Sequence, residues 1–363
     1  METRYALALT FLQGLGASQA LKIIEHYGSA KAFFEDEAPS SEKLLATLPH
    51  RAEALRRADE ELDYCRQNHI RALSMDMEAF PSRLRECADP PLVLFTCGTA
   101  NLNARHIVSV VGTRHVTEYG RDLCRHFCED LAHLVPDALI VSGLAYGVDI
   151  HAHRGALQSG LPTVGVLAHG LDRIYPAHHR DTAARMTQQG GLLTEYPRNT
   201  VPDKGHFVRR NRIIAGLADA TVVVESAVKG GSLITAHLAQ DYNRDIFAFP
   251  GRTADPYSAG CNALIRDNVA SLITSAEDFA LAMRWAVPAA SPQREVLQRD
   301  LFPELSPEEQ LIVACLKDVD RKTISQITSE ASLPFNHVNV LLTGLELKGI
   351  VRALPGGLFR LLQ

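Results

Sequence analysis

The sequence lacks several features that would assign it to a specialised class of protein. Its seven cysteines (65, 87, 97, 124, 128, 261 and 315) include no Cys-x-x-Cys pair, which argues against both a zinc ribbon and a disulfide framework. Residues 1–5 lack the charged and apolar regions of a signal peptide, and no apolar run is long enough to span a bilayer. We therefore expect a reduced, cytoplasmic protein with no membrane partner.

An excess of positive charge is also missing. The 37 Lys and Arg residues are outnumbered by 42 Asp and Glu residues, which gives a formal net charge of −5. This balance excludes a protein coated in basic residues, so any nucleic-acid site must be a local patch that contacts few phosphates. The chain does have length and apolar content: 363 residues that are 46% hydrophobic support two or three packed domains.

The hydrophobic spacing changes along the chain. Residues 1–75 have helical spacing around a glycine turn at 12–16, which resembles a helix-hairpin-helix or SAM-like module; a plain helical bundle explains the turn equally well. The Pro90-Pro91 pair then bars a helix, and a new domain begins nearby. In residues 76–286 strand and helix patterns alternate, which predicts an α/β fold with a Rossmann-like, doubly wound, mostly parallel sheet.

The alternation gives specific boundaries. The expected helices are 119–134, 149–159, 179–189, 210–217 and 232–240. The expected strands are 107–111, 138–141, 163–167, 191–194, 221–224 and 246–248. Ligands of such a sheet bind outside the carboxyl ends of its strands.

Glycine-containing loops follow the strands that end at 111, 141 and 224. A glycine pair between a strand and a helix lets backbone N–H groups converge on an anion, and we expect Ser232 to cap the helix while Lys229 adds charge. Basic residues come just upstream of the strand at 221–224. The loops together predict a shared polyanion site whose members are Gly112, Thr113, Arg114, Ser142, Gly143, Arg210, Asn211, Arg212, Lys229, Gly230, Gly231 and Ser232.

Dinucleotide and metal sites are the first alternatives. The loop at Gly112 does not supply Gly-x-Gly-x-x-Gly, and no acidic residue ends the second strand, so nicotinamide binding is disfavoured. Asp149, His151 and His153 could suggest a metal site. Helix positions two apart point away from each other, however, so Asp149 is expected to cap its helix instead.

An enzyme is a further alternative. Glu195 and Glu225 end two strands and are candidates for acid–base chemistry, although a carboxylate beside arginines more often orients them. A Rossmann-like nucleotide phosphoribohydrolase also places a phosphate loop and a glutamate at these positions. Release of free base would favour that enzyme, length-dependent binding of oligonucleotides would favour DNA, and a protein-interaction scaffold would show neither.

Read together, the loops resemble the DNA-processing protein A family (DprA, also called Smf). The resemblance is dense over residues 80–280. The matching stretches are 110–114, 119–120, 142–153, 155–157, 170–176, 194–197, 210–217, 231–236, 249–251 and 260–265.

The resemblance implies a protein that binds single-stranded DNA, protects it and loads the recombinase RecA onto it during natural transformation. It also implies a homodimer that is not an enzyme and needs no metal or nucleotide cofactor. The family's phosphate pocket maps onto the loop residues given above. This chain departs from the family at Tyr146, where an arginine is usual, at Phe207-Val208, where Phe-Pro is usual, and at His178-His179, where Asn follows the Tyr-Pro element. Tyr146 and Phe207 can stack on bases instead.

The C-terminal part has its own pattern. Residues 287–304 contain three of the chain's prolines among polar residues and predict a linker. Residues 305–363 predict helices at 306–317, 323–331 and 334–348, followed by a hairpin of 350–353 with 358–362, which resembles a winged helix. The helix 334–348 offers few groove-reading side chains, and acids slightly outnumber Lys plus Arg. We therefore expect protein contact or an accessory role rather than sequence-specific duplex binding.

Overall fold

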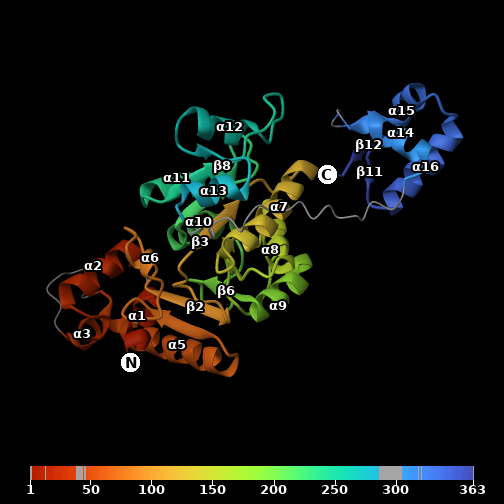
Figure 1. Cartoon of the computed structure of the whole chain (residues 1–363). Helices are drawn as coiled ribbons and strands as arrows, with labels where there is room; N and C mark the ends of the chain where they lie inside the picture. The colour runs from red at the N-terminus through yellow and green to blue at the C-terminus, as the bar shows by residue number, and fades with distance from the viewer. Residues whose placement is uncertain are drawn as a thin grey trace. The chain divides into compact units, whose positions relative to one another are not determined.

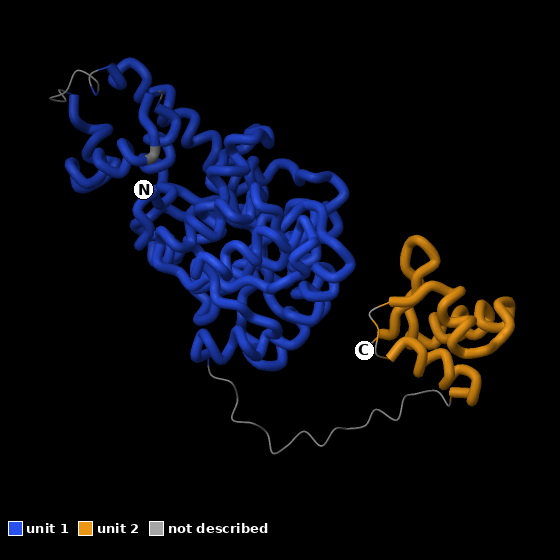
Figure 2. Tube along the Cα trace, turned by 90° about the horizontal axis from the view of Figure 1, so that it is seen from above, with its two compact units in different colours: residues 1–289 blue, residues 290–363 orange. Residues whose placement is uncertain are grey.

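The structure is a computed structural model that describes residues 2–12, 14–37, 44, 46–285, 305–317, 319 and 321–362. It divides into two compact units, residues 1–289 and 290–363, which Figure 2 shows in different colours. The expected linker, 287–304, lies outside the described residues. In the described part of the chain, no helix has both the length and the apolar character needed to cross a membrane.

The first unit begins with helices that pack on one end of a sheet. They are α1 (Glu2–Phe11), α2 (Ala17–Tyr27), α3 (Ala30–Glu35) and α5 (Leu48–Gln67). Leu7 and Leu9 of α1 and Phe33 of α3 share one buried cluster with Val93 and Phe95 of strand β2 (Val93–Gly98). The helices are therefore attached to the sheet through apolar packing. Strand β1 (Arg71–Ser74), which falls within the expected helical module 1–75, is the edge strand beside β2.

The sheet has nine strands in the order β1-β2-β6-β5-β4-β3-β7-β8-β9. From β6 to β9 every neighbouring pair is parallel, whereas β2 runs antiparallel to both β1 and β6. The carboxyl ends of β3, β4 and β7 therefore meet at one edge. The parallel strands are β3 (Ile107–Val111), β4 (Leu139–Ser142), β5 (Thr163–Val166), β6 (Gly190–Thr194), β7 (Ala220–Val223), β8 (Asp245–Ala248) and β9 (Ser271–Leu272).

Helices cover both faces of the sheet because its inner strands are apolar on both sides. In β3, Val108 and Val110 belong to one buried cluster, while Ile107 and Val111 belong to the other. The first cluster includes residues of α7 (Glu118–Leu134), α8 (Val148–Gln158) and α13 (Ala276–Ala282). The second includes residues of α6 (Ser82–Arg85), α10 (Lys204–Leu217), α11 (Gly231–Asp241) and α12 (Ala259–Arg266). Figure 1 shows this layered arrangement.

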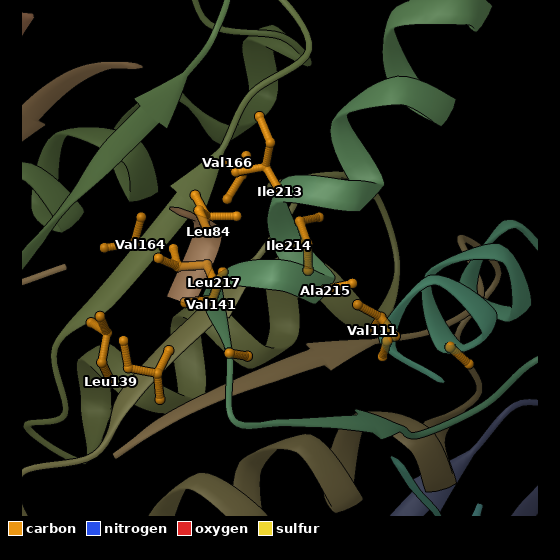
Figure 3. Packing of buried hydrophobic residues seen from close by; sticks show 14 of the residues in the cluster. Leu84, Val111, Leu139, Val141, Val164, Val166, Ile213, Ile214, Ala215 and Leu217 are labelled. Atoms are coloured by element: carbon orange, nitrogen blue, oxygen red, sulfur yellow. The ribbon is translucent and has the colours of Figure 1, made fainter. Parts of the chain in front are cut away.

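Helix α10 is anchored by its apolar side. Ile213, Ile214 and Leu217 belong to the cluster that also contains Val141 and Val164 of neighbouring strands (Figure 3). The polar residues of its first turns are consequently held at the carboxyl edge of the sheet, where a ligand of this fold binds.

The expected strands and helices between 107 and 248 are present, with ends that differ by one or two residues except at α10. Helix α9 spans Arg180–Gln188 after a short 3-10 turn, Ala177–His179. Helix α10 begins six residues before the expected start at 210, because Asp203 caps it by accepting a hydrogen bond from the backbone N–H of His206. The expected doubly wound, mostly parallel sheet is confirmed in outline.

The second unit is a small α/β body. It contains α14 (Pro307–Leu316), α15 (Ile324–Ala331), α16 (Phe335–Leu347) and an antiparallel sheet of β10 (Lys322–Thr323), β12 (Leu358–Leu361) and β11 (Val351–Leu354), in that order. Ile312, Ile327 and Leu342, one from each helix, lie in its core. Helix α14 starts with a reciprocal cap between Ser306 and Glu309, which satisfies backbone N–H groups at its start.

Candidate nucleic-acid interface

A cavity of about 860 Å³ lies where the loops after β3, β4 and β7 meet. We call it the strand-end cavity. Because β3 lies between β4 and β7, the three loops converge at the point where the strand order reverses. Most of the predicted site residues line this cavity: Gly112, Thr113, Arg114, Tyr146, Phe207, Arg210, Asn211, Gly230, Gly231 and Ser232.

Four predicted residues are not among those that line the cavity. The Ser142 hydroxyl donates to the carbonyl of Val110 at 2.6 Å and so joins two strands. Gly143 lies directly against the Arg210 guanidinium, since a Cβ at this position would come within 2.6 Å of it. Arg212 is buried and pairs with Glu195 at 2.5 Å. Lys229 is exposed on the loop before α11. Ser142 and Gly143 therefore support the cavity from behind, whereas Arg212 lines a neighbouring cavity.

Arg210 is a buried cation beneath the cavity. It is 3% exposed, and its Nη1 donates to the carbonyl of Gly143 at 2.7 Å and to the carbonyl of Val166. Burial lowers the pKa of Arg210 to about 10, while the nearby Asp149 carboxylate opposes that shift. The guanidinium thus stays protonated near neutral pH. A charge held in such a poorly solvated position acts on ligands through less screening than a surface charge.

Two predicted helix caps are wrong. The N-cap of α8 is Gly147, and the Asp149 carboxylate instead accepts the N–H groups of Gly143 at 3.2 Å and Ala145 at 3.4 Å. The N-cap of α11 is Gly230, and the Ser232 hydroxyl donates to Ser226 at 2.9 Å. In each case the polar side chain lies inside the first turn, where it orders the preceding loop.

Accessible positive charge in the cavity comes from Arg114 and Lys204. Both side chains are exposed, and within the described ranges neither has an ion-pair partner. The Arg114 guanidinium carbon lies 5.2 Å from the centroid of the Phe207 ring, a cation–π distance that holds the side chain at the cavity. Sequence reasoning identified Arg114 but missed Lys204, because α10 was expected to begin only after it.

Aromatic rings line the same cavity. Tyr146 and Phe207 were expected there, whereas Tyr175 and Tyr257 were not. Tyr146 is 45% exposed and Tyr175 is 49% exposed, so both have free ring surface. The Tyr175 and Phe207 centroids are 6.0 Å apart. Tyr175 comes from the loop that follows β5, and only the stretch 170–176 of the family resemblance pointed to it.

The two glutamates considered for acid–base chemistry do not line the cavity. Glu225 accepts hydrogen bonds from the N–H of Thr117 at 2.9 Å and from its hydroxyl at 2.5 Å, and burial raises the pKa of Glu225. Burial likewise raises the pKa of Glu195, against the opposing effect of Arg212. Both carboxylates therefore hold structural partners.

The candidate metal residues on α8 have separate partners. The Nδ1 of His153 lies 2.7 Å from the hydroxyl of Thr163, and the Asp149 carboxylate faces the loop after β4. Among the residues that the structure describes, no group of three or more His, Cys, Asp or Glu could hold a metal ion. Asp149 and His153 therefore each have a partner within the protein.

Comparisons with known proteins identify the family of this chain. A family model described as DNA recombination-mediator protein A matches residues 71–284. The chain is 34% identical to Protein Smf of Escherichia coli over 308 residues, which are 84% of this chain and 80% of that protein. It is 38% identical to DNA processing protein DprA of Bacillus subtilis over 215 residues, 59% of this chain and 71% of that protein.

Solved structures give the same result. The crystal structure of DNA processing protein A from Streptococcus pneumoniae matches with a TM-score of 0.65 and 31% identity, over 77% of this chain and 97% of that one. The protein from Helicobacter pylori, described as having a unique single-stranded DNA binding mode, matches with a TM-score of 0.54 and 31% identity, over 59% and 95%. The family model alone spans more than half of the chain, so the predicted resemblance is confirmed and the chain belongs to the DNA processing protein A (DprA/Smf) family of recombination mediators.

Proposed function

We propose that this chain binds single-stranded DNA in the strand-end cavity, protects it, and loads RecA onto it for recombination during natural transformation. The observation that carries the proposal is that cations without an ion pair and aromatic rings lie together at the carboxyl ends of the strands. Arg114 and Lys204 offer charge for phosphates, while Tyr146, Tyr175 and Phe207 offer ring surface for bases. A single strand presents both kinds of group together.

Backbone groups add to the phosphate site. Gly230, Gly231 and Ser232 at the start of α11 line the cavity, and the first N–H groups of a helix have no acceptor within the helix. Gly231 is open, because a Cβ placed there would have no heavy atom within 4 Å. A phosphate can therefore come close to the amide groups of this turn.

The cavity favours a single strand over a duplex. Bases in a duplex are stacked on one another and paired, so their faces are not available to Tyr146 and Tyr175. Contacts to phosphates and ring faces carry little base identity, so the proposed binding is sequence-tolerant. The relative from Helicobacter pylori, described by its single-stranded DNA binding mode, supports the choice of ligand.

Fluorescence anisotropy with a labelled oligo-dT strand tests this proposal. The wild type is expected to bind the single strand more tightly than its duplex, and a mononucleotide is expected to compete poorly. The Arg114→Ala variant should bind more weakly to all sequences by a similar factor. Binding of the mononucleotide alone would instead identify a small-molecule site.

We also propose that the chain acts without catalysis. The nucleotide phosphoribohydrolase alternative requires a carboxylate that reaches the ligand, whereas Glu225 and Glu195 are held by Thr117 and Arg212 outside the cavity lining. The two carboxylates in the lining, Asp149 and Asp203, accept hydrogen bonds from backbone N–H groups of their own loops and helix starts. Release of free base from nucleoside monophosphates, measured by chromatography, tests this alternative. Base release that is abolished by Glu225→Gln would favour the enzyme.

The family supports three finer assignments, which we propose for this chain. It works as a cytoplasmic homodimer, its first helices form a SAM-like module, and its second unit is a winged-helix-like accessory domain. Light scattering of the purified protein tests the dimer. A RecA strand-loading assay on DNA covered by single-strand-binding protein tests the loading activity.

A further inference from the structure

A second cavity adjoins the strand-end cavity along α10. Its volume is about 880 Å³, and one wall is formed by Gly16, Ser18 and Gln19 at the start of α2. The other wall comes from α10 and α11 and includes Lys204 and Arg209. We call this second cavity the side cleft. It places the first helices of the chain opposite the helix that carries the cations of the proposed DNA site.

The two cavities are adjacent and share part of their lining. Lys204, Val208 and Ile234 line both of them. Val208 is 51% exposed and Ile234 is 41% exposed, so they form an apolar ridge between the cavities. A strand that leaves the strand-end cavity across this ridge enters the side cleft without leaving the protein surface. Sugars and base faces are the parts of a nucleotide that can pack on such a ridge.

The charge of the side cleft suits an anion. Arg209 is exposed and, like Lys204, forms no side-chain hydrogen bond or ion pair among the residues that the structure describes, although its charge acts on the nearby Glu195. The one acid in the lining, Asp89, accepts a hydrogen bond from the Tyr242 hydroxyl and lies 3.8 Å from the Nε of Arg212. Its charge is therefore already engaged, and the accessible groups are cationic.

The facing wall adds hydrogen-bond donors. Gly16 is the N-cap of the eleven-residue helix α2. The N–H of Gln19 donates to the Gly16 carbonyl at 3.0 Å and the Gln19 side chain accepts the Gly16 N–H at 3.4 Å, which leaves the N–H groups of residues 17 and 18 as the donors at this end of the helix. The exposed hydroxyl of Ser18 and amide of Gln19 lie beside them. This is the glycine turn whose role the sequence left open between phosphate contact and plain helix packing. Here it faces the cleft that holds Arg209.

We propose that the side cleft binds phosphates of the same single strand that occupies the strand-end cavity. Arg209 and the first turn of α2 hold the phosphates that flank the bound segment, so the N-terminal helices form part of the DNA path. The ligand is the phosphodiester backbone, without base identity. This inference rests on the proposed function, and it predicts that the two cavities respond to different lengths of DNA.

A length series of oligo-dT separates the two sites. Strands of about 4 nucleotides fill the strand-end cavity, whereas strands of about 20 nucleotides also reach the side cleft, since a single-strand binding groove takes roughly 4–16 nucleotides. Binding of the full chain is measured by anisotropy at low salt. The variants are Arg209→Ala and Ser18→Glu. Arg185→Ala is the matched control, because α9 ends just before β6 begins and Arg185 thus lies at the opposite edge of the sheet.

Arg209→Ala should weaken binding of the long strand by about two- to fivefold, the range for one solvent-exposed charge contact, and leave the short strand unchanged. Its salt slope for the long strand should fall by about 0.7. Ser18→Glu should weaken only long-strand binding too, although an acid in the first turn stabilises α2. This second variant distinguishes a lost contact from a damaged helix.

Other results would overturn the inference in identifiable ways. If short strands bind but both variants bind long strands like wild type, the side cleft is not on the DNA path. If Arg209→Ala instead reduces only RecA loading, the cleft receives an acidic protein segment and the phosphate assignment is wrong. If no strand binds at any length, the proposed function itself fails.

Discussion

The cations at the proposed DNA site and several basic residues of the second unit differ in how they are partnered. In the second unit Lys348 pairs with Glu309 at 2.7 Å, Lys322 pairs with Glu330 at 2.5 Å, and His337 lies 2.8 Å from Glu308. At the proposed site Arg114, Lys204 and Arg209 form no ion pair within the described ranges, although the charge of Arg209 favours the ionised form of Glu195, and they line two adjoining cavities. Our proposal for the DNA site therefore rests on charge that lies beside a cavity without an ion pair, and not on the fold of the second unit.

The largest expected effect is a loss of stability on removal of Arg210, the buried residue beneath the strand-end cavity. Arg210→Ala removes the donor from two buried carbonyls, of Gly143 and Val166, and leaves the buried Asp149 carboxylate without its nearby cation. The free energy of unfolding should fall by about 3 kcal/mol. Urea unfolding followed by fluorescence measures it, with Arg185→Ala as the exposed control. Equal stability of the two variants would show that Arg210 is not structural.

Acid should weaken the first unit before the second. Burial lowers the pKa of His153 to about 3. Below about pH 6.5 this imidazole is therefore protonated in the unfolded chain but stays neutral in the folded chain. Stability from this group is complete above that pH and is lost as pH falls, by up to about 1.4 kcal/mol per pH unit. In the second unit the hydrogen bond from Lys348 lowers the pKa of Glu309. The stability that this ion pair contributes is therefore lost only in more acidic solution.

The single tryptophan makes this comparison measurable. Trp285 is 9% exposed in the first unit and packs on Phe279, so its fluorescence reports that unit alone. Urea midpoints should fall between pH 7 and pH 5, and the fall should be smaller in His153→Asn. A midpoint that does not change with pH in the wild type contradicts the assignment.

Base stacking should account for the next largest effect. Tyr175→Ala removes an exposed ring beside Phe207 and should weaken binding of oligo-dT by about 1–3 kcal/mol, whereas Tyr175→Phe keeps the ring and should bind like wild type. Anisotropy titrations of the three proteins give the comparison. Equal losses in both variants would mean that the hydroxyl, not the ring, makes the contact.

Loss of an exposed phosphate contact should have a smaller effect. Arg114→Ala should weaken single-strand binding by up to about 1 kcal/mol at low salt and reduce the slope of log affinity against log salt by about 0.7. Titrations with dT and dA strands at several salt concentrations measure both values. If the affinity falls for only one of the two strands, Arg114 contacts the bases and contributes to sequence specificity.

The smallest effect is expected in the second unit. Glu330→Gln frees Lys322 from its partner and should raise weak duplex binding by no more than about twofold, because an exposed ion pair contributes little. Glu35→Gln, which frees the Lys31 ammonium on α3, is a control with the same change of charge. A large gain in the first variant alone would show that paired cations are what keeps the second unit from DNA.

The sequence predicted the sheet well because its inner strands are short β-branched runs, such as 107–111 and 221–224, separated by amphipathic helices. It also predicted correctly that the loops after β3, β4 and β7 lie close together. It could not predict which basic residue is exposed: Arg209, Arg210 and Arg212 are close in sequence, yet only the first is exposed. That difference depends on the rotation of α10 against the sheet.

Other parts of the site depend on contacts between distant segments. Tyr175 and Tyr257 reach the strand-end cavity from loops more than eighty residues apart, and no local pattern links them. The start of α10 was missed because Lys204, Gly205 and His206 are polar and have no apolar spacing. The side cleft was not predicted, because it requires the glycine turn at Gly16 to lie opposite Arg209.

Cross-linking tests the central claim most directly. An oligo-dT strand that carries photoreactive iodouracil is irradiated on the full chain, and the adducts are located by mass spectrometry. The account predicts adducts on Tyr146, Tyr175 or Phe207 at the strand-end cavity, and their loss when unlabelled single strand competes. Adducts confined to residues 305–362 would contradict it, because the DNA would then be bound by the second unit and not at the strand-end cavity.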